Sequence, residues 1–317
     1  MRFRHTAEPA APSPAKKPGR SLLWETLVFF LVYALCSLGS LLVMIVLSEW
    51  LFLPLLGDLT NSGAAGNSAA LMEEVLSSPY LMLMMLFSTV STIAVVILFC
   101  RCIQKRSWDS MGLSRKGAFL LYLRGILLGG IAISLAVAAC AAAGGGSFRN
   151  ADPASVPLIL LFGLAYLIQG ASEELLCRGY FMYSVARRYP MWLAVGISSV
   201  FFALLHLSNS GVSMTAFLNL FLFGVFSALI TIRTGSVWYA SGFHSAWNFF
   251  QGNFYGIKVS GMDMNSSVLH FVSDPSRAYL NGGDFGMEGS FLCTVLLTLC
   301  ILLTLRRSWP GSHVSHS

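Results

Sequence analysis

Charged residues are scarce in this 317-residue chain. They make up 11% of the sequence, whereas hydrophobic residues, counted without glycine, make up 56%. A soluble domain has about 25% charged residues, and one soluble core could not bury this much apolar surface. The same numbers exclude disorder, a collagen-like chain and a small disulfide-rich scaffold. The composition therefore predicts an integral membrane protein.

Several patterns that define other classes of protein are also missing. The seven cysteines are odd in number and lie in or beside apolar stretches, without zinc-type spacing, so we interpret them as small buried hydrophobic residues. No repeat of 20–50 residues is apparent, which disfavours a transporter built from inverted repeats. The net charge of +6 comes from basic residues scattered between apolar blocks. Without one basic face, binding of nucleic acid is not expected.

Long apolar stretches dominate the rest of the chain. A bilayer core about 30 Å thick needs about 20 apolar residues per helix. Eight segments are candidates: 22–47, 80–102, 118–143, 155–187, 191–207, 213–232, 236–255 and 290–305. The fifth is short, and the fourth is too long for one span, so its last turns should leave the lipid. The expected fold is all-α, with about eight transmembrane helices.

The few charges alternate along the connections between these segments. The tail 1–20, the connection after the second segment and the ends of the fourth, sixth and eighth segments are basic. The connection 48–79 has no lysine or arginine, and the loop 256–289 is mostly acidic. Under the positive-inside rule both termini are cytoplasmic and the loop 256–289 is exterior. Gly125 and Gly129 form a G-x-x-x-G motif, which we interpret as close helix packing rather than a dimer interface.

The fourth segment places three charged residues at membrane depth, where each costs about 2.5–3.5 kcal/mol on insertion scales. Glu174 and Arg178 are four residues apart, so a helix brings them together on one face at ion-pair distance. Glu173 points about 100° away and has no local partner. Because a buried carboxylate without a cation suits a general base or acid, we interpret Glu173 as catalytic. Glu174 and Arg178 are interpreted as a structural ion pair.

Two later segments carry histidines at comparable depth. His206 is the only histidine of the fifth segment, and such a residue can also be a hydrogen-bonded core residue. His244 and Asn248 share a helix face in the seventh segment, where they could bind a metal, hold an oxyanion or bridge helices. At a rise of about 1.5 Å per residue, these side chains can meet Glu173 inside the membrane. We expect the resulting polar cluster to be reachable from the cytoplasmic side.

Together these segments resemble the CAAX-protease and bacteriocin-processing family of intramembrane proteases, also called the Abi family. The family's motifs are E-E-x-x-x-R, F-x-x-x-H and H-x-x-x-N, or a close variant of the last. The positions that match them, in order, are Glu173, Glu174 and Arg178, then Phe202 and His206, then His244 and Asn248. The resemblance covers about 155–252, roughly a third of the chain.

The resemblance implies an all-helical membrane core that hydrolyses a peptide bond of a membrane-associated peptide or protein. Carried over, Glu173 would activate the attacking water with the help of His206. His244 and Asn248 would stabilise the tetrahedral oxyanion, where one donor is worth about 2.7–4 kcal/mol. The residues that would structure this site are Glu174, Arg178 and Phe202.

Metal dependence is the open point of this interpretation. The family is often described as metalloproteases, and zinc would be held here by Glu173, His206 and His244. However, the zinc motif H-E-x-x-H is absent, and the resemblance also allows a metal-free glutamate mechanism, which we prefer. Two alternative hypotheses remain. One is a catalytically silent binding, immunity or regulatory protein of the same family, and the other is a proton-coupled transporter that uses Glu173 and His206 as a proton relay.

The chain is therefore divided into four parts. Residues 1–20 are a disordered basic cytoplasmic tail, and 21–150 hold three transmembrane helices with their loops. Residues 151–255 are the CAAX-protease-like catalytic membrane core. Residues 256–317 comprise the exterior loop, the final helix and a short cytoplasmic tail. The small loops and basic tail are typical of a bacterial multi-pass protein of the inner membrane.

Overall fold

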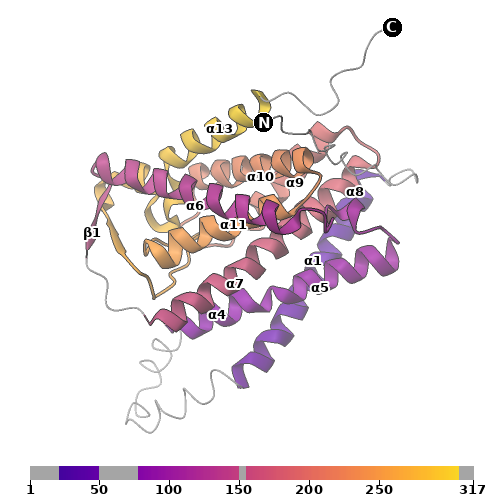
Figure 1. Ribbon diagram of the computed structural model, residues 1–317, viewed down its shortest axis with the longest axis horizontal. Helices are drawn as coiled ribbons and strands as arrows, with labels where there is room; N and C mark the ends of the chain where they lie inside the picture. The colour runs from indigo at the N-terminus through magenta and orange to yellow at the C-terminus, as the bar shows by residue number, and fades with distance from the viewer. Residues whose placement is uncertain (1–20, 50–77, 150–154, 307–317) are drawn as a thin grey trace, which may run out of the picture.

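The computed structural model describes residues 21–49, 78–149 and 155–306, and within them the chain is almost entirely helical (Figure 1). One two-stranded antiparallel sheet is present in this part, formed by β1 (Gly146–Arg149) and β2 (His270–Ser273). The predicted tail 1–20, most of the connection 48–79 and the tail after Arg306 lie outside the described residues.

Every predicted apolar segment contains a helix. The first three segments contain α1 (Leu22–Leu47), then α4 (Pro79–Ser88), α5 (Val90–Leu98) and a π-helical turn (Phe99–Ile103), then α6 (Ala118–Ala142). The fourth contains α7 (Val156–Glu174), a π-helical segment (Leu175–Met182) and α8 (Tyr183–Ala186). The others contain α9 (Met191–Leu204), α10 (Met214–Thr234), α11 (Trp238–Phe249) with a π-helical turn (Phe250–Phe254), and α13 (Phe291–Arg306). The loop before α13 contains α12 (Ala278–Asn281) and short 3-10 turns at Pro275–Arg277, Gly283–Phe285 and Met287–Gly289, and another such turn, Asp109–Met111, precedes α6.

Five helical stretches of the described residues are long and apolar enough to cross a membrane: Leu22–Leu47, Pro79–Ile103, Ala118–Ala142, Val156–Ala186 and Met214–Thr234. α9 and α13 are apolar but shorter, with 14 and 16 residues. α11 has 12 residues, and nine of them are buried within the protein. An all-α polytopic membrane fold is therefore confirmed, while the count of eight crossings stays a prediction for α9, α11 and α13.

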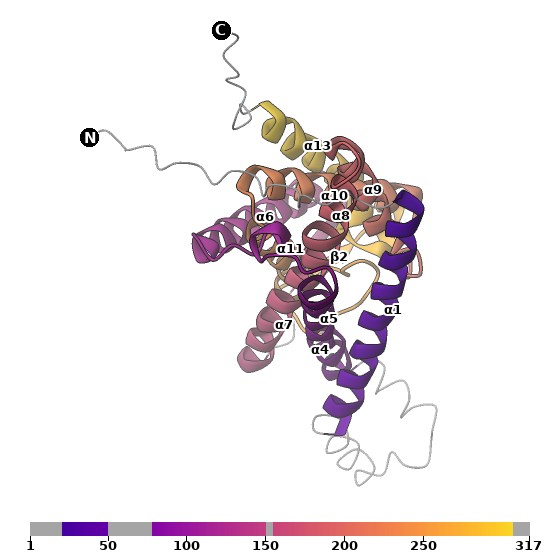
Figure 2. The ribbon, with the colours of Figure 1, turned by 90° about the vertical axis from the view of Figure 1, so that its right-hand side faces the viewer.

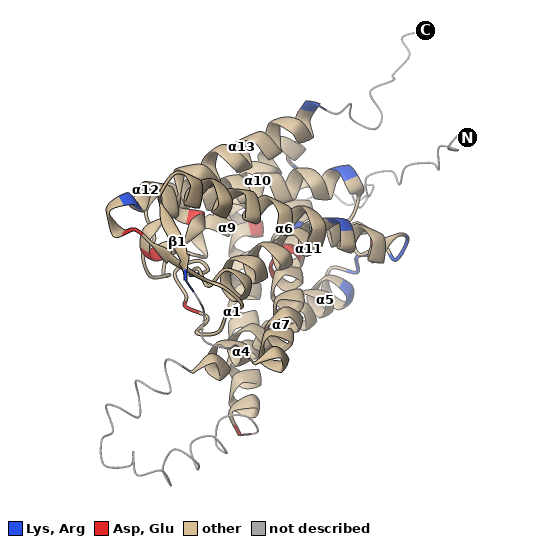
Figure 3. Ribbon diagram, turned by 60° about the vertical axis from the view of Figure 1, so that its left-hand side comes forward, with Lys and Arg blue, Asp and Glu red and all other residues tan. Residues whose placement is uncertain are grey.

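The basic residues at several helix ends lie on one side of the molecule, whereas those at α12 and beside β1 lie on the other (Figure 3). Figure 3 places those at the start of α6 and at the ends of α10 and α13 at the same side. Arg233 lies in the last turn of α10 and Arg306 in the last turn of α13. These are the ends that the positive-inside rule assigns to the cytoplasm, so the helix directions agree with the predicted topology.

α6 and α11 touch through their backbones. A Cβ atom on Gly125 would lie 2.2 Å from the carbonyl oxygen of Tyr239, and one on Gly129 would lie 2.2 Å from that of Phe243. Only glycine permits such an approach. The G-x-x-x-G motif therefore packs a helix of the same chain, as its interpretation as an intramolecular contact predicted.

α11 also packs closely on α7, the helix that carries the two glutamates. A Cβ atom on Gly170 would lie 2.5 Å from Ser245 Oγ. The Tyr122 hydroxyl from α6 lies 2.9 Å from the same Oγ and donates to the Leu167 carbonyl oxygen at 3.0 Å. These contacts fix α11 between α6 and α7 and bring the motif residues of α7 and α11 together.

α1 lies along the edge of the helix bundle, as Figure 2 shows. The ring centroid of Phe29 lies 4.3 Å from that of Phe181 and 5.4 Å from that of Phe201. Further along α1, the Ser40 hydroxyl lies 2.8 Å from the Ser91 hydroxyl of α5. The outer face of α1 carries exposed leucine and phenylalanine side chains, as expected for a helix that faces lipid.

Candidate active site

The two adjacent glutamates lie where α7 changes from α-helical to π-helical geometry. Glu173 and Glu174 are its last two residues, and the π-helical segment begins at Leu175. π-helical turns occur frequently at functional sites. The Glu174 side chain is fully buried, whereas that of Glu173 is 28% exposed. The two carboxylates therefore face different surroundings, as the helix geometry predicted.

Glu174 forms the predicted pair with Arg178 and a second contact that was not predicted. Its Oε1 lies 3.3 Å from Arg178 Nη1 and 3.0 Å from His244 Nδ1. The Arg178 guanidinium also lies 4.6 Å from the ring centroid of Phe202, a cation–π contact. All of these groups are buried. Glu174 and Arg178 thus fix His244 and Phe202 relative to α7.

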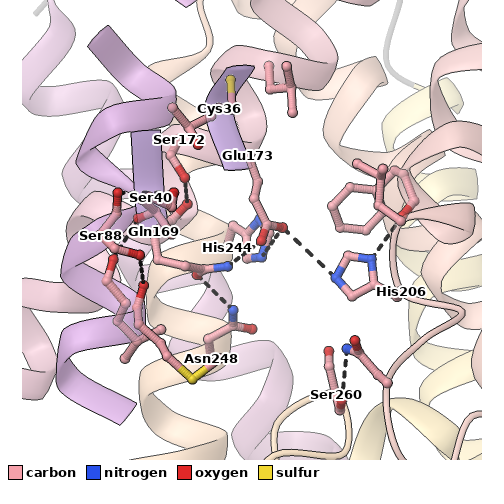
Figure 4. A pocket seen from close by; sticks show the side chains of 18 of the residues that line it. Cys36, Ser40, Ser88, Gln169, Ser172, Glu173, His206, His244, Asn248 and Ser260 are labelled. Carbon is pink, nitrogen blue, oxygen red and sulfur yellow. Dashed lines mark hydrogen bonds and ion pairs between the residues drawn. The ribbon is translucent and has the colours of Figure 1, made fainter. Parts of the chain in front are cut away.

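Glu173 faces both motif histidines, as Figure 4 shows. Its Oε2 lies 3.7 Å from His244 Nε2 and 4.0 Å from His206 Nε2. Its Oε1 accepts a hydrogen bond from Gln169 Nε2 at 2.7 Å. The prediction that Glu173 has no local partner is therefore wrong. Gln169 precedes it by one helical turn, but a neutral amide leaves the carboxylate charge without a cationic partner on its own helix.

His206 lies just beyond the end of α9, which ends at Leu204. Its Nδ1 is 2.8 Å from the carbonyl oxygen of Phe202. Because a carbonyl oxygen only accepts, Nδ1 carries the hydrogen, and Nε2 of the neutral ring is left as an acceptor. That acceptor is the nitrogen that faces Glu173.

Asn248 and His244 share a face of α11, as their spacing predicted. Asn248 Nδ2 donates to Gln169 Oε1 at 3.0 Å, so the Gln169 amide joins Asn248 to Glu173. Sequence reasoning missed Gln169, although its position four residues before Glu173 on a helix was a usable signal.

A cavity of about 430 Å³ is lined by Gln169, Glu173, His206, His244 and Asn248. Hydroxyl-bearing residues of the first two segments also line it, among them Tyr33, Ser37 and Ser40 of α1. The first three predicted helices had no assigned role, so this contribution was also missed. Their lone serines and tyrosine give no motif by which sequence could have found them.

One further wall of the cavity is formed by Val259, Ser260, Met262 and Glu288. They belong to the loop 256–289, which the charge pattern assigns to the exterior. No lining residue in the described part of the chain comes from the loops with basic residues at 104–117, 187–190 or 233–237. With the predicted topology, the loop-covered end of the cavity is the exterior end, and access from the cytoplasmic side stays a prediction.

The described residues do not form a metal site by geometry. No group of three histidine, cysteine, aspartate or glutamate side chains among them is arranged to hold a metal ion, and this includes Glu173, His206 and His244. The zinc alternative with Glu173, His206 and His244 stays a prediction, and the chemistry below uses the chain's own groups.

The Glu173 carboxylate, two histidines and two amides thus surround a single cavity. Residues 155–250 match the family model described as type II CAAX prenyl endopeptidase Rce1-like. This match confirms the resemblance to the CAAX-protease family and supports, at the level of the family, a CAAX-type intramembrane protease. Comparison with curated proteins and with solved structures gave no match.

Proposed function

We propose that this protein is an intramembrane endopeptidase that hydrolyses a peptide bond of a membrane-associated peptide or protein. One observation carries the proposal: Glu173 Oε2 faces the Nε2 atoms of both His206 and His244 at one wall of the cavity. The three side chains come from separate helical segments, so their approach is a product of the fold rather than of local spacing.

Glu173 and His206 are placed to activate water. The 4.0 Å between Glu173 Oε2 and His206 Nε2 is too long for a direct hydrogen bond. Both atoms accept hydrogen bonds when the ring is neutral, so one water molecule can donate to each of them. The Glu173 carboxylate then takes a proton from this water as general base, while the oxygen attacks the scissile carbonyl carbon. The same carboxyl group later returns the proton to the leaving amine.

His244 and Asn248 are placed to stabilise the oxyanion that this attack creates. Because His244 Nδ1 donates to Glu174, its Nε2 donates only when the ring carries both protons, and that charged ring would lie between two carboxylates. The Asn248 amide uses one N–H on Gln169 and keeps the second for substrate. Each donor to the oxyanion is worth about 2.7–4 kcal/mol of transition-state stabilisation.

The test is cleavage of a membrane-associated peptide library, including prenylated peptides, by purified protein in proteoliposomes. Mass spectrometry of the products should find cleavage by the wild type and none by Glu173→Ala with an unchanged unfolding transition. Asp284→Ala is the matched control, because it removes an exposed carboxylate outside the cavity and should cleave normally. Equal cleavage by Glu173→Ala and wild type would refute the proposed function.

A folded wild-type protein that cleaves nothing would favour the catalytically silent alternative, a binding, immunity or regulatory protein. The proton-coupled transporter has a separate readout, solute uptake into proteoliposomes that depends on a pH gradient. Uptake that needs both the gradient and Glu173, without any cleavage, would favour that alternative.

A further inference from the structure

A third carboxylate lies in the wall of the catalytic cavity. Glu288 belongs to the 3-10 turn Met287–Gly289, beyond the segment 155–250 that matches the family model. The residue is 6% exposed, and it lines the same cavity as Glu173. No motif named in the sequence assigns it a role.

Neutral donors hold Glu288 in place. Its Oε2 accepts hydrogen bonds from the backbone N–H of Ser260 at 2.7 Å and from the Ser260 hydroxyl at 2.8 Å. Its backbone carbonyl oxygen accepts from Asn219 Nδ2 at 2.7 Å. In the described part of the chain, no lysine, arginine or histidine forms an ion pair with it, and no hydrogen bond reaches its Oε1. The carboxyl group is therefore fixed in position but lacks a cationic partner.

The rest of the cavity does not supply that partner. Its ionisable lining consists of Glu173, Glu288, His206, His244, Tyr33, Tyr166 and Cys36 with Cys177, and no lysine or arginine of the described residues lines it. Burial raises the pKa of the Glu288 carboxyl group, while the nearby histidines and the Ser260 hydrogen bonds act in the opposite direction. A desolvated carboxylate of this kind is stabilised when a cation binds beside it.

We propose that Glu288 is a specificity-determining residue that binds the ammonium or guanidinium group of a lysine or arginine side chain of the substrate, close to the scissile bond. This inference rests on the proposed function and names the class of substrate: membrane-associated segments with a basic residue beside the cleaved bond. A substrate that presents its free C-terminal carboxylate to this wall is disfavoured, because two carboxylates already face the cavity.

The test compares kcat/KM for pairs of cleaved peptides that differ by one residue, lysine or the uncharged norleucine, at each position next to the scissile bond. For wild type, the lysine peptide should be preferred by about tenfold at one position, the size of one charge-assisted hydrogen bond. In Glu288→Gln the ratio of kcat/KM for the lysine peptide to kcat/KM for the norleucine peptide should fall to about one. Glutamine keeps an oxygen that accepts both Ser260 hydrogen bonds, so the loop should hold its conformation.

Asp284→Asn is the matched control, since it neutralises a neighbouring carboxylate that is 82% exposed and does not line the cavity. It should keep the preference of the wild type. N-acetylated copies of each peptide distinguish a basic side chain from a free N-terminal ammonium group: the preference should survive acetylation. Wild-type protein that cleaves both members of every pair equally would overturn the proposal, whether or not Glu288→Gln folds.

Binding separates this inference from the proposed function. Fluorescent peptides bound to Glu173→Gln protein should show the same lysine preference, and that preference should disappear when Glu288→Gln is added. Absence of cleavage together with a lysine preference that depends on Glu288 would refute the endopeptidase and keep the cation subsite. Cleavage without any preference for lysine, in binding or in kcat/KM, would keep the endopeptidase and refute the cation subsite.

Discussion

Glu173 and Glu174 are neighbours in the chain but have different chemical surroundings. Glu174 is fully buried and contacts Arg178 and His244, so its charge is compensated inside the protein. Glu173 reaches the cavity, where a neutral amide and two histidines surround it. A carboxylate that must bind and release a proton needs the second environment, and a residue that fixes a neighbouring helix needs the first.

At this scale we predict that Glu174→Gln is strongly destabilising. Arg178 Nε and Nη2 have no hydrogen-bond partner among the described residues, so Glu174 is the main compensation for its buried charge. Loss of one partner of such a pair costs about 3–5 kcal/mol, whereas removing an exposed charge has an effect within about 0.5 kcal/mol. Reversible unfolding in mild detergent measures the difference.

Asp284→Asn serves as the exposed control for this experiment. The double variant Glu174→Gln with Arg178→Met should recover part of the lost stability, because neither charge is then left alone. A Glu174→Gln protein as stable as wild type would show that the pair does not hold the site together.

At the scale of the helices, the contact between α6 and α11 decides where His244 and Asn248 lie. α11 is too short and too polar to be held by lipid alone, and its position comes from glycine contacts with α6 and α7. The π-helical segment after Glu174 belongs to the same local structure, since it brings Arg178 against both Glu174 and the Phe202 ring.

Gly129→Ala should therefore destabilise the fold by about 1–3 kcal/mol and lower activity, as expected for overpacking. Its Cβ would meet backbone atoms of Phe243, next to His244, and backbone cannot rotate away. Gly196→Ala in α9 is the matched control, because a Cβ there meets nothing within 4 Å, and it should be neutral or slightly stabilising. Unfolding and peptide cleavage are measured for both, and an equal response would refute the packing argument.

At the scale of the whole molecule, the predicted topology puts the cavity that Glu173 lines beneath an exterior loop. The loop 256–289 supplies a wall of the cavity, and the basic helix ends lie on one side of the molecule (Figure 3).

Labelling with a membrane-impermeant maleimide tests this arrangement in cysteine-free protein that carries one new cysteine. Tyr279→Cys, at a residue that is 63% exposed, should be labelled on intact cells. Lys116→Cys, in the basic connection before α6, should be labelled only after permeabilisation. The opposite pattern would invert the topology and place the cavity wall on the cytoplasmic side.

Local spacing in the sequence predicted the parts of the site that lie on one helix. The pair of Glu174 with Arg178 and the shared face of His244 and Asn248 follow from the helical period. The long apolar stretches predicted the helices in the same way. Gly125 and Gly129 predicted close packing, although their partner, α11, could not be named from the sequence.

Contacts between distant segments could not be predicted in this way. The wall formed by Ser260 and Glu288 depends on how a long loop folds back onto Asn209, after α9, and Asn219 of α10, and no repeated spacing in the sequence records it. The contact of His244 with Glu174 joins two helices that are 70 residues apart in the chain. The loop that covers the cavity could not be predicted for the same reason, because helix depth alone does not tell which loops lie over a cavity.

The most direct test of the central claim, that Glu173 and His206 act on one water molecule, is a double-mutant cycle on kcat/KM for peptide cleavage. Glu173→Gln should lower kcat/KM by at least about a hundredfold, as expected for loss of a general base, while the protein stays folded. His206→Gln should also lower it, and the double variant should be little slower than Glu173→Gln alone, since residues that act as a unit are not additive. A Glu173→Gln protein with wild-type kcat/KM, or fully additive losses in the double variant, would contradict the claim.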